Sequence, residues 1–291
     1  MSVESALELI ESVKDCKVLL VGDTIIDAYH YVKPLSQAAK EHLIPVRYRN
    51  KEHFAGGVDA AAAHVRSFCS YVDVASAGPA TRKVRFVEEN YLRKLFEVHY
   101  QDGMGGRAWP ALGTYDCVIV ADFGHGEIRA ASDVDGAKFL AVSAQTNSAN
   151  RGYNLITKYP SADYIVIDEP EARLAAADQH GHIEDVIHKL AHGRCDKFVV
   201  TQGNRGATGY QNGHFFHQKG LTDLVRDTMG AGDAFFAITA PMAMTGHMED
   251  LLMIGNAAGA IKTGIIGHRA SVTKEALIEF IASYNRRKNS V

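Results

Sequence analysis

The fold expected of this chain follows from one stretch, Arg226-Asp227-Thr228-Met229-Gly230-Ala231-Gly232-Asp233-Ala234-Phe235-Phe236. Gly230 and Gly232 can adopt backbone angles that are closed to other residues, and they leave successive N–H groups unobstructed. The apolar pattern of a helix begins immediately afterwards, so these groups stand at a helix N-terminus, where the helix dipole favours an anion such as phosphate. Asp233 lies in the first turn of that helix, and a carboxylate there can orient a hydroxyl group and accept its proton. A short Gly-x-Gly-Asp turn alone is also typical of an ordinary helix start.

The longer string, Asp-Thr-x-Gly-Ala-Gly-Asp-Ala-Phe, resembles the C-terminal signature of the ribokinase-like sugar kinases, also called the PfkB family. The resemblance implies that Asp233 is the catalytic base and that residues 230–232 form the anion hole. It also implies that Asp227 and Thr228 lie against the nucleotide. The expected activity is transfer of the γ-phosphoryl group of ATP to a hydroxyl group of a sugar or sugar phosphate, with Mg²⁺ as the second cofactor.

Two further segments resemble nucleotide-binding parts of the same family. Residues 201–206 read Thr-Gln-Gly-Asn-Arg-Gly and follow a predicted strand. They resemble the family's Thr-x-Gly-x-x-Gly loop, which implies that Thr201, Gly203 and Gly206 contact ATP. Asn256 lies on a later predicted helix that flanks the adenine pocket in the family. Common glycine turns and helix packing by small residues explain the same positions without a nucleotide.

A metal site is expected at the start of another predicted helix. Asp168-Glu169-Pro170-Glu171 corresponds to the family's Asn-x-x-Glu, whose glutamate organises magnesium. Aspartate replaces asparagine at position 168 and adds negative charge beside the metal and the phosphates. Mg²⁺ prefers carboxylate, water and phosphate oxygens, which favours Glu171 and Asp168 as metal residues. Otherwise the two carboxylates simply favour the start of the helix.

The acceptor site is expected among residues that follow predicted strands. Asp23 and Asp27 resemble the family's N-terminal entry, where an aspartate holds acceptor hydroxyls, since each carboxylate accepts several hydrogen bonds. Gly56 and Gly57 resemble a Gly-Gly motif at which bare backbone lets the acceptor approach. Asp122 ends a strand, as an active-site loop requires. Turn and capping roles remain open for the aspartates, as does a plain helix start for the glycines.

A closer likeness is to the kinase half of bacterial bifunctional ADP-heptose synthases and to related kinases of surface-sugar pathways. The resemblance rests on residues 21–31, 81–86, 93–95 and 121–126. It draws attention to a basic cluster in the predicted lid, which consists of Arg82, Lys83, Arg85, Arg93 and Lys94. A phosphorylated acceptor needs such cations, and phosphorylation of the anomeric hydroxyl of a sugar phosphate is one hypothesis. A solvated strand face explains the same charges. The polar loop at residues 145–150 is a further candidate for substrate contact.

The bulk composition excludes several other classes of protein. The chain has 291 residues, 46% of them hydrophobic, and a formal net charge of −3. A general nucleic-acid or membrane-surface binder needs a basic field, so neither partner is expected. The four cysteines show no metal-ligand spacing and favour reduced thiols. The acidic, amphipathic N-terminus is unlike a signal peptide, and no apolar run is long enough to span a bilayer, so we expect a cytoplasmic protein.

Short apolar β-rich runs alternate with helical patterns, which predicts an α/β fold: a ribokinase-like, mostly parallel central sheet flanked by helices, with a small β lid. Strands are expected at residues 17–22, 116–121, 164–167 and 197–201, and a hairpin is expected at Gln211-Asn212-Gly213. Helices are expected at 58–68, 132–144, 169–177, 183–191, 231–244, 251–263 and 274–285. We interpret residues 1–291 as a single kinase domain with lid elements at about 43–50 and 82–100. An exposed lid sheet weakly indicates a homodimer.

Several departures from the family pattern put acceptor specificity in doubt. The segments between residue 74 and Arg82 and between Tyr100 and Asp116 are much shorter than the family leads us to expect. Asp59 stands near the position where the family often has asparagine. A nucleoside kinase of the same fold, or a weakly catalytic sensor or scaffold that binds nucleotide or sugar phosphate, therefore remains an alternative. The absence of a Gly-x-Gly-x-x-Gly loop after the first strand argues against a dehydrogenase.

Overall fold

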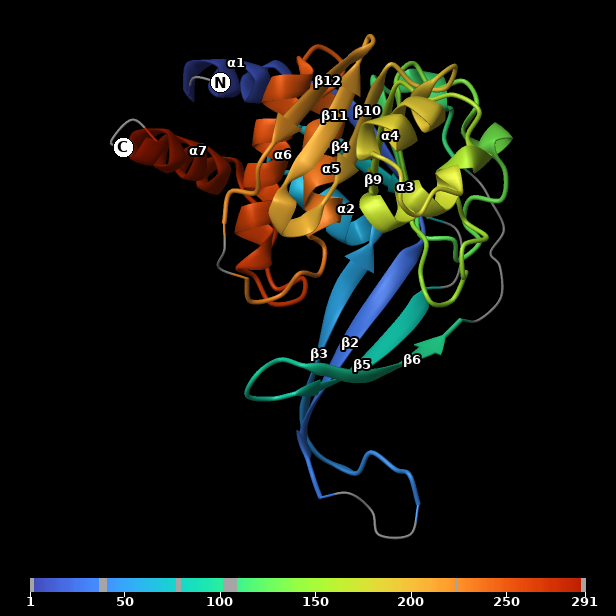
Figure 1. The fold of residues 1–291 in the computed structure, drawn as a ribbon, viewed down its shortest axis with the longest axis vertical. Coiled ribbons are helices and arrows are strands. Elements are labelled where there is room, and N and C mark those ends of the chain that lie inside the picture. The colour runs from blue at the N-terminus through green and yellow to red at the C-terminus, as the bar shows by residue number, and fades with distance from the viewer. Residues whose placement is uncertain (1–2, 37–40, 77–79, 102–108, 223–224, 289–291) are drawn as a thin grey trace.

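The structure is a computed structural model that describes residues 3–36, 41–76, 80–101, 109–222 and 225–288 (Figure 1). An eight-stranded sheet runs through the body in the order β12-β11-β10-β9-β8-β7-β1-β4. Its strands are β1 (Lys17–Gly22), β4 (Tyr71–Ala75), β7 (Cys117–Asp122), β8 (Leu140–Ala144), β9 (Tyr164–Asp168), β10 (Lys197–Thr201), β11 (Ala207–Gln211) and β12 (His214–Gln218). The pairs from β4 to β10 are parallel, and β10-β11-β12 are antiparallel.

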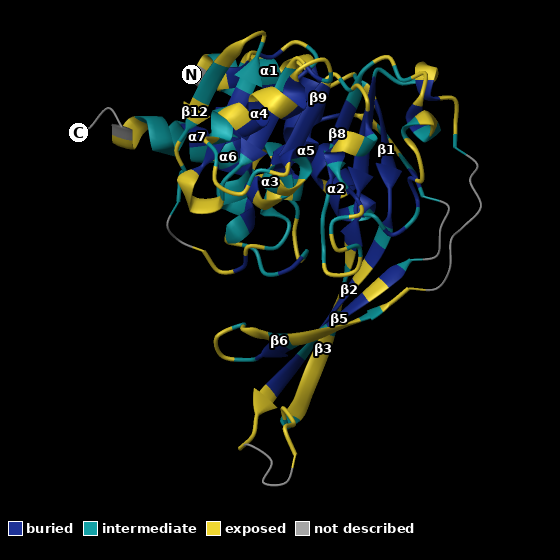
Figure 2. Ribbon diagram, turned by 45° about the vertical axis from the view of Figure 1, so that its right-hand side comes forward, coloured by how far each residue is buried: buried dark blue, intermediate teal, exposed yellow. Residues whose placement is uncertain are grey.

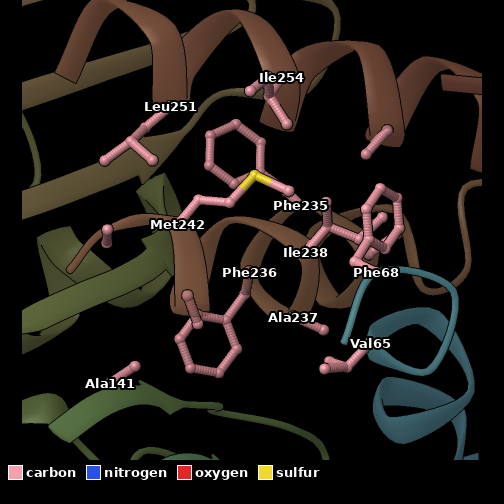
Figure 3. Packing of buried hydrophobic residues seen from close by; sticks show 14 of the residues in the cluster. Val65, Phe68, Ala141, Phe235, Phe236, Ala237, Ile238, Met242, Leu251 and Ile254 are labelled. Carbon is pink, nitrogen blue, oxygen red and sulfur yellow. The ribbon is translucent and has the colours of Figure 1, made fainter. Parts of the chain in front are cut away.

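Helices cover both faces of this sheet, which is why its central strands are apolar throughout rather than alternating. They are α1 (Val3–Ser12), α2 (Val58–Val65), α3 (Glu169–Ala176), α4 (Ile183–Ala191), α5 (Ala231–Met242), α6 (Met248–Thr263) and α7 (Lys274–Lys288). In β1, Val18 and Leu20 pack in the core with α2, α5 and α6, whereas Leu19 and Val21 pack in the core with α3 and α4. Figure 3 shows the first of these cores, where Phe235 of α5 lies between its own helix and α6.

A second, four-stranded sheet projects from the body as the lid (Figure 1). Its order is β3-β2-β5-β6, with bounds β2 (Thr24–Pro34), β3 (Val46–Gly57), β5 (Thr81–Glu88) and β6 (Lys94–Tyr100). β2 and β5 pair in parallel, and the two outer pairs are antiparallel. Figure 2 shows that β3 is largely exposed, whereas much of β2 is buried. β2 begins within two residues of the end of β1, so the lid is joined directly to the edge of the body where the parallel strands end.

The predicted fold class is confirmed: the body is a mostly parallel sheet flanked by helices, with a small β lid. The predicted hairpin also forms, because Asn212 and Gly213 both adopt the positive φ angles, 49° and 87°, that a tight hairpin turn requires. Within the part of the chain that the structure describes, no helix is both long and apolar enough to cross a membrane.

The helix predicted at residues 132–144 is wrong. Residues 131–134 form one short 3₁₀ turn, η2 (Ala131–Val134), and β8 follows as a buried strand between β7 and β9. Five apolar and small residues in a row cannot distinguish a buried strand from a buried helix segment, and Gly136, at φ 88°, separates the two elements. The polar loop that starts at Gln145 therefore follows a strand rather than a helix.

Candidate active site

A cavity of about 990 Å³ lies where the ends of the parallel strands, the start of α5 and the lid meet. Residues from β8, β9 and β10 reach it at their C-terminal ends, which is where ligands bind in open α/β sheets. Its wall contains these sequence-predicted residues: Asp27, Gly57, Lys83, Arg85, Asp168, Glu171, Thr201, Gly203, Gly206, Thr228, Gly230, Ala231, Gly232, Asp233 and Asn256. The predicted nucleotide, metal and acceptor residues therefore largely share one cavity.

The glycine turn at the start of α5 forms part of this wall. Gly230 is the residue before the helix and adopts φ 73°, a left-handed conformation that suits glycine. A Cβ atom there would lie 3.0 Å from Cε1 of His268 and 3.3 Å from Cε of Lys262. Gly232 is exposed, and a Cβ atom there would meet no atom within 4 Å. The first turn of α5 thus opens onto the cavity with its N–H groups and the positive end of the helix dipole.

Asp233 lies in this first turn, partly buried and on the cavity wall. Its Oδ1 accepts a hydrogen bond of 2.7 Å from Nε2 of Gln145, in the loop after β8. Burial raises the pKa of the Asp233 carboxyl, while the nearby positive charges of His268, Lys262 and Lys83 lower it. The carboxylate is therefore held in one orientation among cations, in a place where it can accept a proton.

Asp168 and Glu171 form a capping box at the start of α3. Oδ1 of Asp168 accepts the backbone N–H of Glu171 at 2.7 Å, and Oε2 of Glu171 accepts that of Asp168 at 2.9 Å. Oε1 of Glu171 also accepts the N–H of Thr146 at 3.0 Å. Burial and the charge of Asp168 raise the pKa of Glu171 to about 8. The helix-start interpretation is thus realised, and both carboxylates still face the cavity.

These two carboxylates fit a magnesium ion that is bound mainly through a nucleotide. Among the described residues, no group of three or more His, Cys, Asp or Glu side chains could hold a metal alone. Mg²⁺ commonly uses one or two carboxylates and completes its six oxygens with water and substrate phosphates. A raised carboxyl pKa also means that the pair gains from a neighbouring cation, which removes part of the cost of its charge.

The loop after β10 brings glycine backbone to the cavity. Gly203 and Gly206 adopt φ 60° and 100°, and a Cβ atom on Gly206 would lie 1.9 Å from the carbonyl oxygen of Gln218. Position 206 therefore requires glycine. Asn256 lies on the wall from α6, and its amide donates to the carbonyl of Leu252 at 2.8 Å. Thr201 ends β10 at the same place.

Asp227, which the sequence predicts to lie against the nucleotide, is not among the residues of the cavity wall. Its carboxylate is occupied by internal partners: Tyr29 Oη at 3.1 Å, Lys94 Nζ at 3.0 Å, Met229 N at 3.1 Å and Gly267 N at 2.9 Å. These bonds join the lid to the loop before α5, and they lower the pKa of Asp227 despite its burial. Its neighbour Thr228 does line the cavity.

Asp23 and Asp122, predicted to contact the acceptor, are also absent from the wall. The Asp23 carboxylate accepts the N–H groups of Phe123, His125 and Glu127 at 3.0, 3.3 and 3.0 Å. Asp122 accepts Tyr159 Oη at 2.6 Å and Asn154 Nδ2 at 3.0 Å. Both are buried, at 4% and 1% exposure. A buried carboxylate needs such donors, so in this structure both side chains organise the loop after β7.

The lid contributes a charged cluster to the other end of the cavity. Asp27 on β2 pairs with Arg85 on β5 and lies 3.4 Å from Nε2 of His268. Arg85 also pairs with Glu97 on β6 at 3.2 Å. Gly57, at φ 59°, lies on the wall; Gly56 does not, and a Cβ atom there would lie 2.7 Å from Oδ2 of Asp27. Gly56 therefore leaves space for the Asp27 carboxylate.

The predicted basic cluster divides between two faces of the lid, because neighbouring residues of a strand point to opposite sides. Lys83 and Arg85 face the cavity. Arg82 turns away and stacks on Tyr100 with its guanidinium carbon 4.1 Å from the ring centre. Lys94 pairs with Asp227. Arg93 lies near the ring of Tyr91 and does not line the cavity.

His268 and Arg173 are among the cavity residues that the sequence did not predict, and Gln145 was predicted only as part of a polar loop. His268 follows α6 in a loop without a recognisable motif, about 35 residues after Asp233 in the sequence. No local pattern could have brought it to Asp27 on the lid. Lys262, which is buried beneath the glycine turn, was not predicted either, because a lysine in a helix ordinarily faces solvent.

Comparisons with known proteins agree with this geometry. A family model described as pfkB family carbohydrate kinase matches residues 136–275, which include the glycine turn, Asp233 and both nucleotide-side loops. A ribokinase from Thermotoga maritima shares the fold with a TM-score of 0.70, over 92% of this chain and 99% of that chain, at 16% identity. A nucleoside kinase from Methanocaldococcus jannaschii aligns with a TM-score of 0.68 over 93% and 99%, at 13% identity.

Among curated proteins, the bifunctional protein HldE of Bradyrhizobium diazoefficiens is 26% identical over 92% of this chain and 63% of that protein. This chain therefore spans less than two thirds of the length of that relative. The fold is that of ribokinases. The family model over residues 136–275 and the HldE relatives make this chain similar to carbohydrate kinases of the PfkB family, so the resemblance predicted from the sequence is confirmed.

Proposed function

We propose that this protein transfers the γ-phosphoryl group of ATP to a hydroxyl group of a phosphorylated sugar, with Asp233 as the base. One observation carries the proposal: a single cavity contains the glycine turn and Asp233 together with Lys83 and Arg85 of the lid. The turn suits the phosphoryl group that moves, whereas the lid cations suit a second phosphate on the acceptor. Asp233 lies on the wall of the same cavity as both groups of residues.

In this mechanism, the acceptor hydroxyl oxygen attacks the γ-phosphorus, the bond from that phosphorus to the bridging oxygen of ADP breaks, and Asp233 takes the hydroxyl proton. Gln145 fixes the carboxylate through its 2.7 Å hydrogen bond. The N–H groups of residues 230–232 and the dipole of α5 stabilise the negative charge on the phosphoryl oxygens. The chain's own contribution is thus one proton acceptor and one preorganised anion site.

Asp168 and Glu171 would hold the magnesium ion of the nucleotide, directly or through water. When bound there, Mg²⁺ supplies positive charge that neutralises the phosphate oxygens. Thr201, Gly203, Gly206 and Asn256 would surround the rest of the nucleotide, because the glycine backbone permits close approach along that wall. The family's use of ATP supports this half of the proposal.

The phosphorylated acceptor is inferred from Lys83. Its side chain lines the cavity at 7% exposure, and no described residue accepts a hydrogen bond from its ammonium group in the structure. Burial lowers the pKa of this ammonium group although the carboxylates of Asp27, Glu97 and Asp233 raise it, so an anionic ligand beside it would offset part of the remaining cost of burial. A neutral sugar or nucleoside would not. The relatives named HldE support a sugar kinase in general. The sequence likeness to the kinase half of ADP-heptose synthases makes a heptose phosphate the acceptor that we propose to test first.

The test is ATP turnover with Mg²⁺ against matched acceptors: free hexoses and heptoses, their phosphates, and nucleosides. We expect ADP release to depend on a sugar phosphate and to be at least tenfold slower with the corresponding free sugar, since each charged hydrogen bond contributes about 1.5–3 kcal/mol. Equal rates with free sugars would refute the phosphorylated acceptor. Turnover with nucleosides alone would indicate a nucleoside kinase. ATP binding without turnover on any acceptor would favour the sensor alternative.

A further inference from the structure

Lys262 is a fully buried lysine directly beneath the glycine turn. It lies on α6 with 0% of its surface exposed, although lysines are almost never fully buried without partners. Its ammonium group donates to the carbonyl oxygen of Met229 at 2.8 Å and to that of Gly267 at 2.6 Å. Met229 immediately precedes Gly230, and Gly267 immediately precedes His268. The lysine thus joins the two loops that carry the anion turn and the cavity histidine.

The carboxylate of Asp227 binds the same two residues, Met229 and Gly267, through their backbone N–H groups. Its carboxylate accepts the N–H of Met229 at 3.1 Å and the N–H of Gly267 at 2.9 Å. One anion therefore binds both amide N–H groups, and one cation binds both carbonyl groups. Two loops that are distant in sequence are fixed to each other by four charge-assisted hydrogen bonds, which are about twice as strong as neutral ones.

This arrangement sets the direction of the peptide between Met229 and Gly230. In a trans peptide the C=O and N–H groups point in opposite directions. Because the carbonyl of Met229 points to the buried ammonium group, the N–H of Gly230 points away from it. Gly230 lies on the cavity wall, and a Cβ atom there would be 3.3 Å from Cε of Lys262. The ammonium group therefore also places a fixed positive charge behind the anion site.

We propose that Lys262 is a positioning residue for phosphoryl transfer: it holds the turn at residues 229–230 in its phosphate-binding geometry and places its ammonium group behind it. The proposal rests on the proposed function and deepens it, because it assigns part of the anion site's charge to a residue that does not touch the substrate. The ammonium group of Lys262 would also take the place of a bound monovalent cation, because such ions bind backbone carbonyl oxygens like those of Met229 and Gly267.

The test compares Lys262→Met with Lys197→Met. Lys197 is the matched control, because its ammonium group also donates to two backbone carbonyls, those of Ala243 at 2.6 Å and Gly246 at 2.9 Å, and it does not line the cavity. We expect Lys262→Met to lower kcat by about a hundredfold, similar to the loss of one anion-hole donor, and to weaken ATP binding about tenfold. Lys197→Met should change each value by less than about threefold, whatever it does to stability.

Two further variants keep the test decisive if Lys262→Met folds poorly. Lys262→Gln retains a hydrogen-bond donor without the charge, and it should still lose turnover by about tenfold or more. Lys262→Ala leaves space, and added ammonium or potassium ions should restore part of its turnover and ATP affinity. Tetramethylammonium, which is too large and donates no hydrogen bond, should not. The wild-type enzyme should respond equally to all three salts.

The outcomes separate this proposal from the proposed function. Wild-type protein that turns over no acceptor would refute the function, while ATP affinity of the variants would still test Lys262. Normal turnover in Lys262→Gln, or equal losses in Lys197→Met, would overturn the positioning role. So would a wild-type enzyme that requires potassium, because the buried ammonium group would then not replace it.

Discussion

On the nucleotide side of the cavity, glycines at positions 203, 206, 230 and 232 present backbone groups, whereas on the acceptor side charged side chains from the lid face one another. The first wall is built from local turns, and Lys262 of α6 holds one of them through the carbonyl of Met229. The second depends on pairs such as Asp27 with Arg85 and His268, which come from two lid strands and from the loop after α6. The family model covers the first wall and stops short of the lid, which precedes residue 136.

The difference shows how each wall binds its ligand. The backbone N–H groups at this helix start are fixed by the helix and by the hydrogen bonds of Lys262 and Asp227 to Met229, so the anion site exists before the nucleotide arrives. On the acceptor side, Arg85 already forms an ion pair with the carboxylate of Asp27. Lys83 lies beside it on the cavity wall and has space for a ligand. A rigid wall for a common cosubstrate and an adaptable wall for a particular acceptor allow one fold to serve several sugars.

The largest effect is expected where the two walls meet. Asp233→Asn removes the proton acceptor and keeps the shape, so kcat should fall by about a thousandfold, within the usual range for general bases, while ATP affinity changes less than about threefold. Asp185→Asn is the control, since Asp185 lies in the first turn of α4, is exposed and does not line the cavity. Steady-state kinetics and ATP titration measure both. Unchanged kcat in Asp233→Asn would exclude Asp233 as the base.

A smaller effect, confined to the acceptor wall, is expected from Lys83→Ala. The KM for a phosphorylated acceptor should rise by about 10- to 100-fold, because a charged hydrogen bond is lost, and the KM for ATP should stay within about twofold. Arg82→Ala is the control: the neighbouring cation lies on the other face of β5, over Tyr100. If the KM for ATP rose as much as that for the acceptor, Lys83 would belong to the nucleotide wall, and the division between the walls would be wrong.

The same comparison explains what the sequence could predict. A glycine turn has a local cause, since φ angles such as 73° at Gly230 depend on neighbouring residues, and a motif of nine residues therefore predicts its place in the fold. Asp168 and Glu171 were equally accessible to prediction, because a capping box is complete within four residues. The alternating helices and strands predict the layers in a similar way.

The aspartates of the acceptor side could not be assigned from local sequence. Asp23, Asp27 and Asp122 all lie at or near strand ends, yet only Asp27 faces the cavity. The Asp23 carboxylate accepts hydrogen bonds from backbone N–H groups about 100 residues later in the chain, including that of Glu127. No local sequence pattern indicates such a distant contact. β8 was mistaken for a helix because the two parallel neighbours that bury it also lie far away in the sequence.

The smallest effect concerns the loop after β7, which contains a buried polar side chain without a hydrogen-bond partner in the described part of the chain. Both ring nitrogens of His125 are buried without a hydrogen-bond partner among the described residues, at 6% residue exposure. Burial, followed by the positive charges of Lys83 and His99, lowers the pKa of His125 to about 4. Because this lies below the unfolded value of about 6.5, the unfolded chain binds the proton first, and stability is lost as pH falls from 6.5 towards 4.

His125→Leu should therefore stabilise the protein by about 1 kcal/mol at pH 7, because an unsatisfied buried group is removed. It should also reduce the loss of unfolding free energy between pH 6.5 and 4 by about 2 kcal/mol. Urea unfolding at pH 7, 5.5 and 4.5 measures both, with the exposed His214→Leu as a control that should change stability by less than about 0.5 kcal/mol. A less stable His125→Leu protein with the wild-type pH dependence would mean that the ring is hydrogen-bonded in solution.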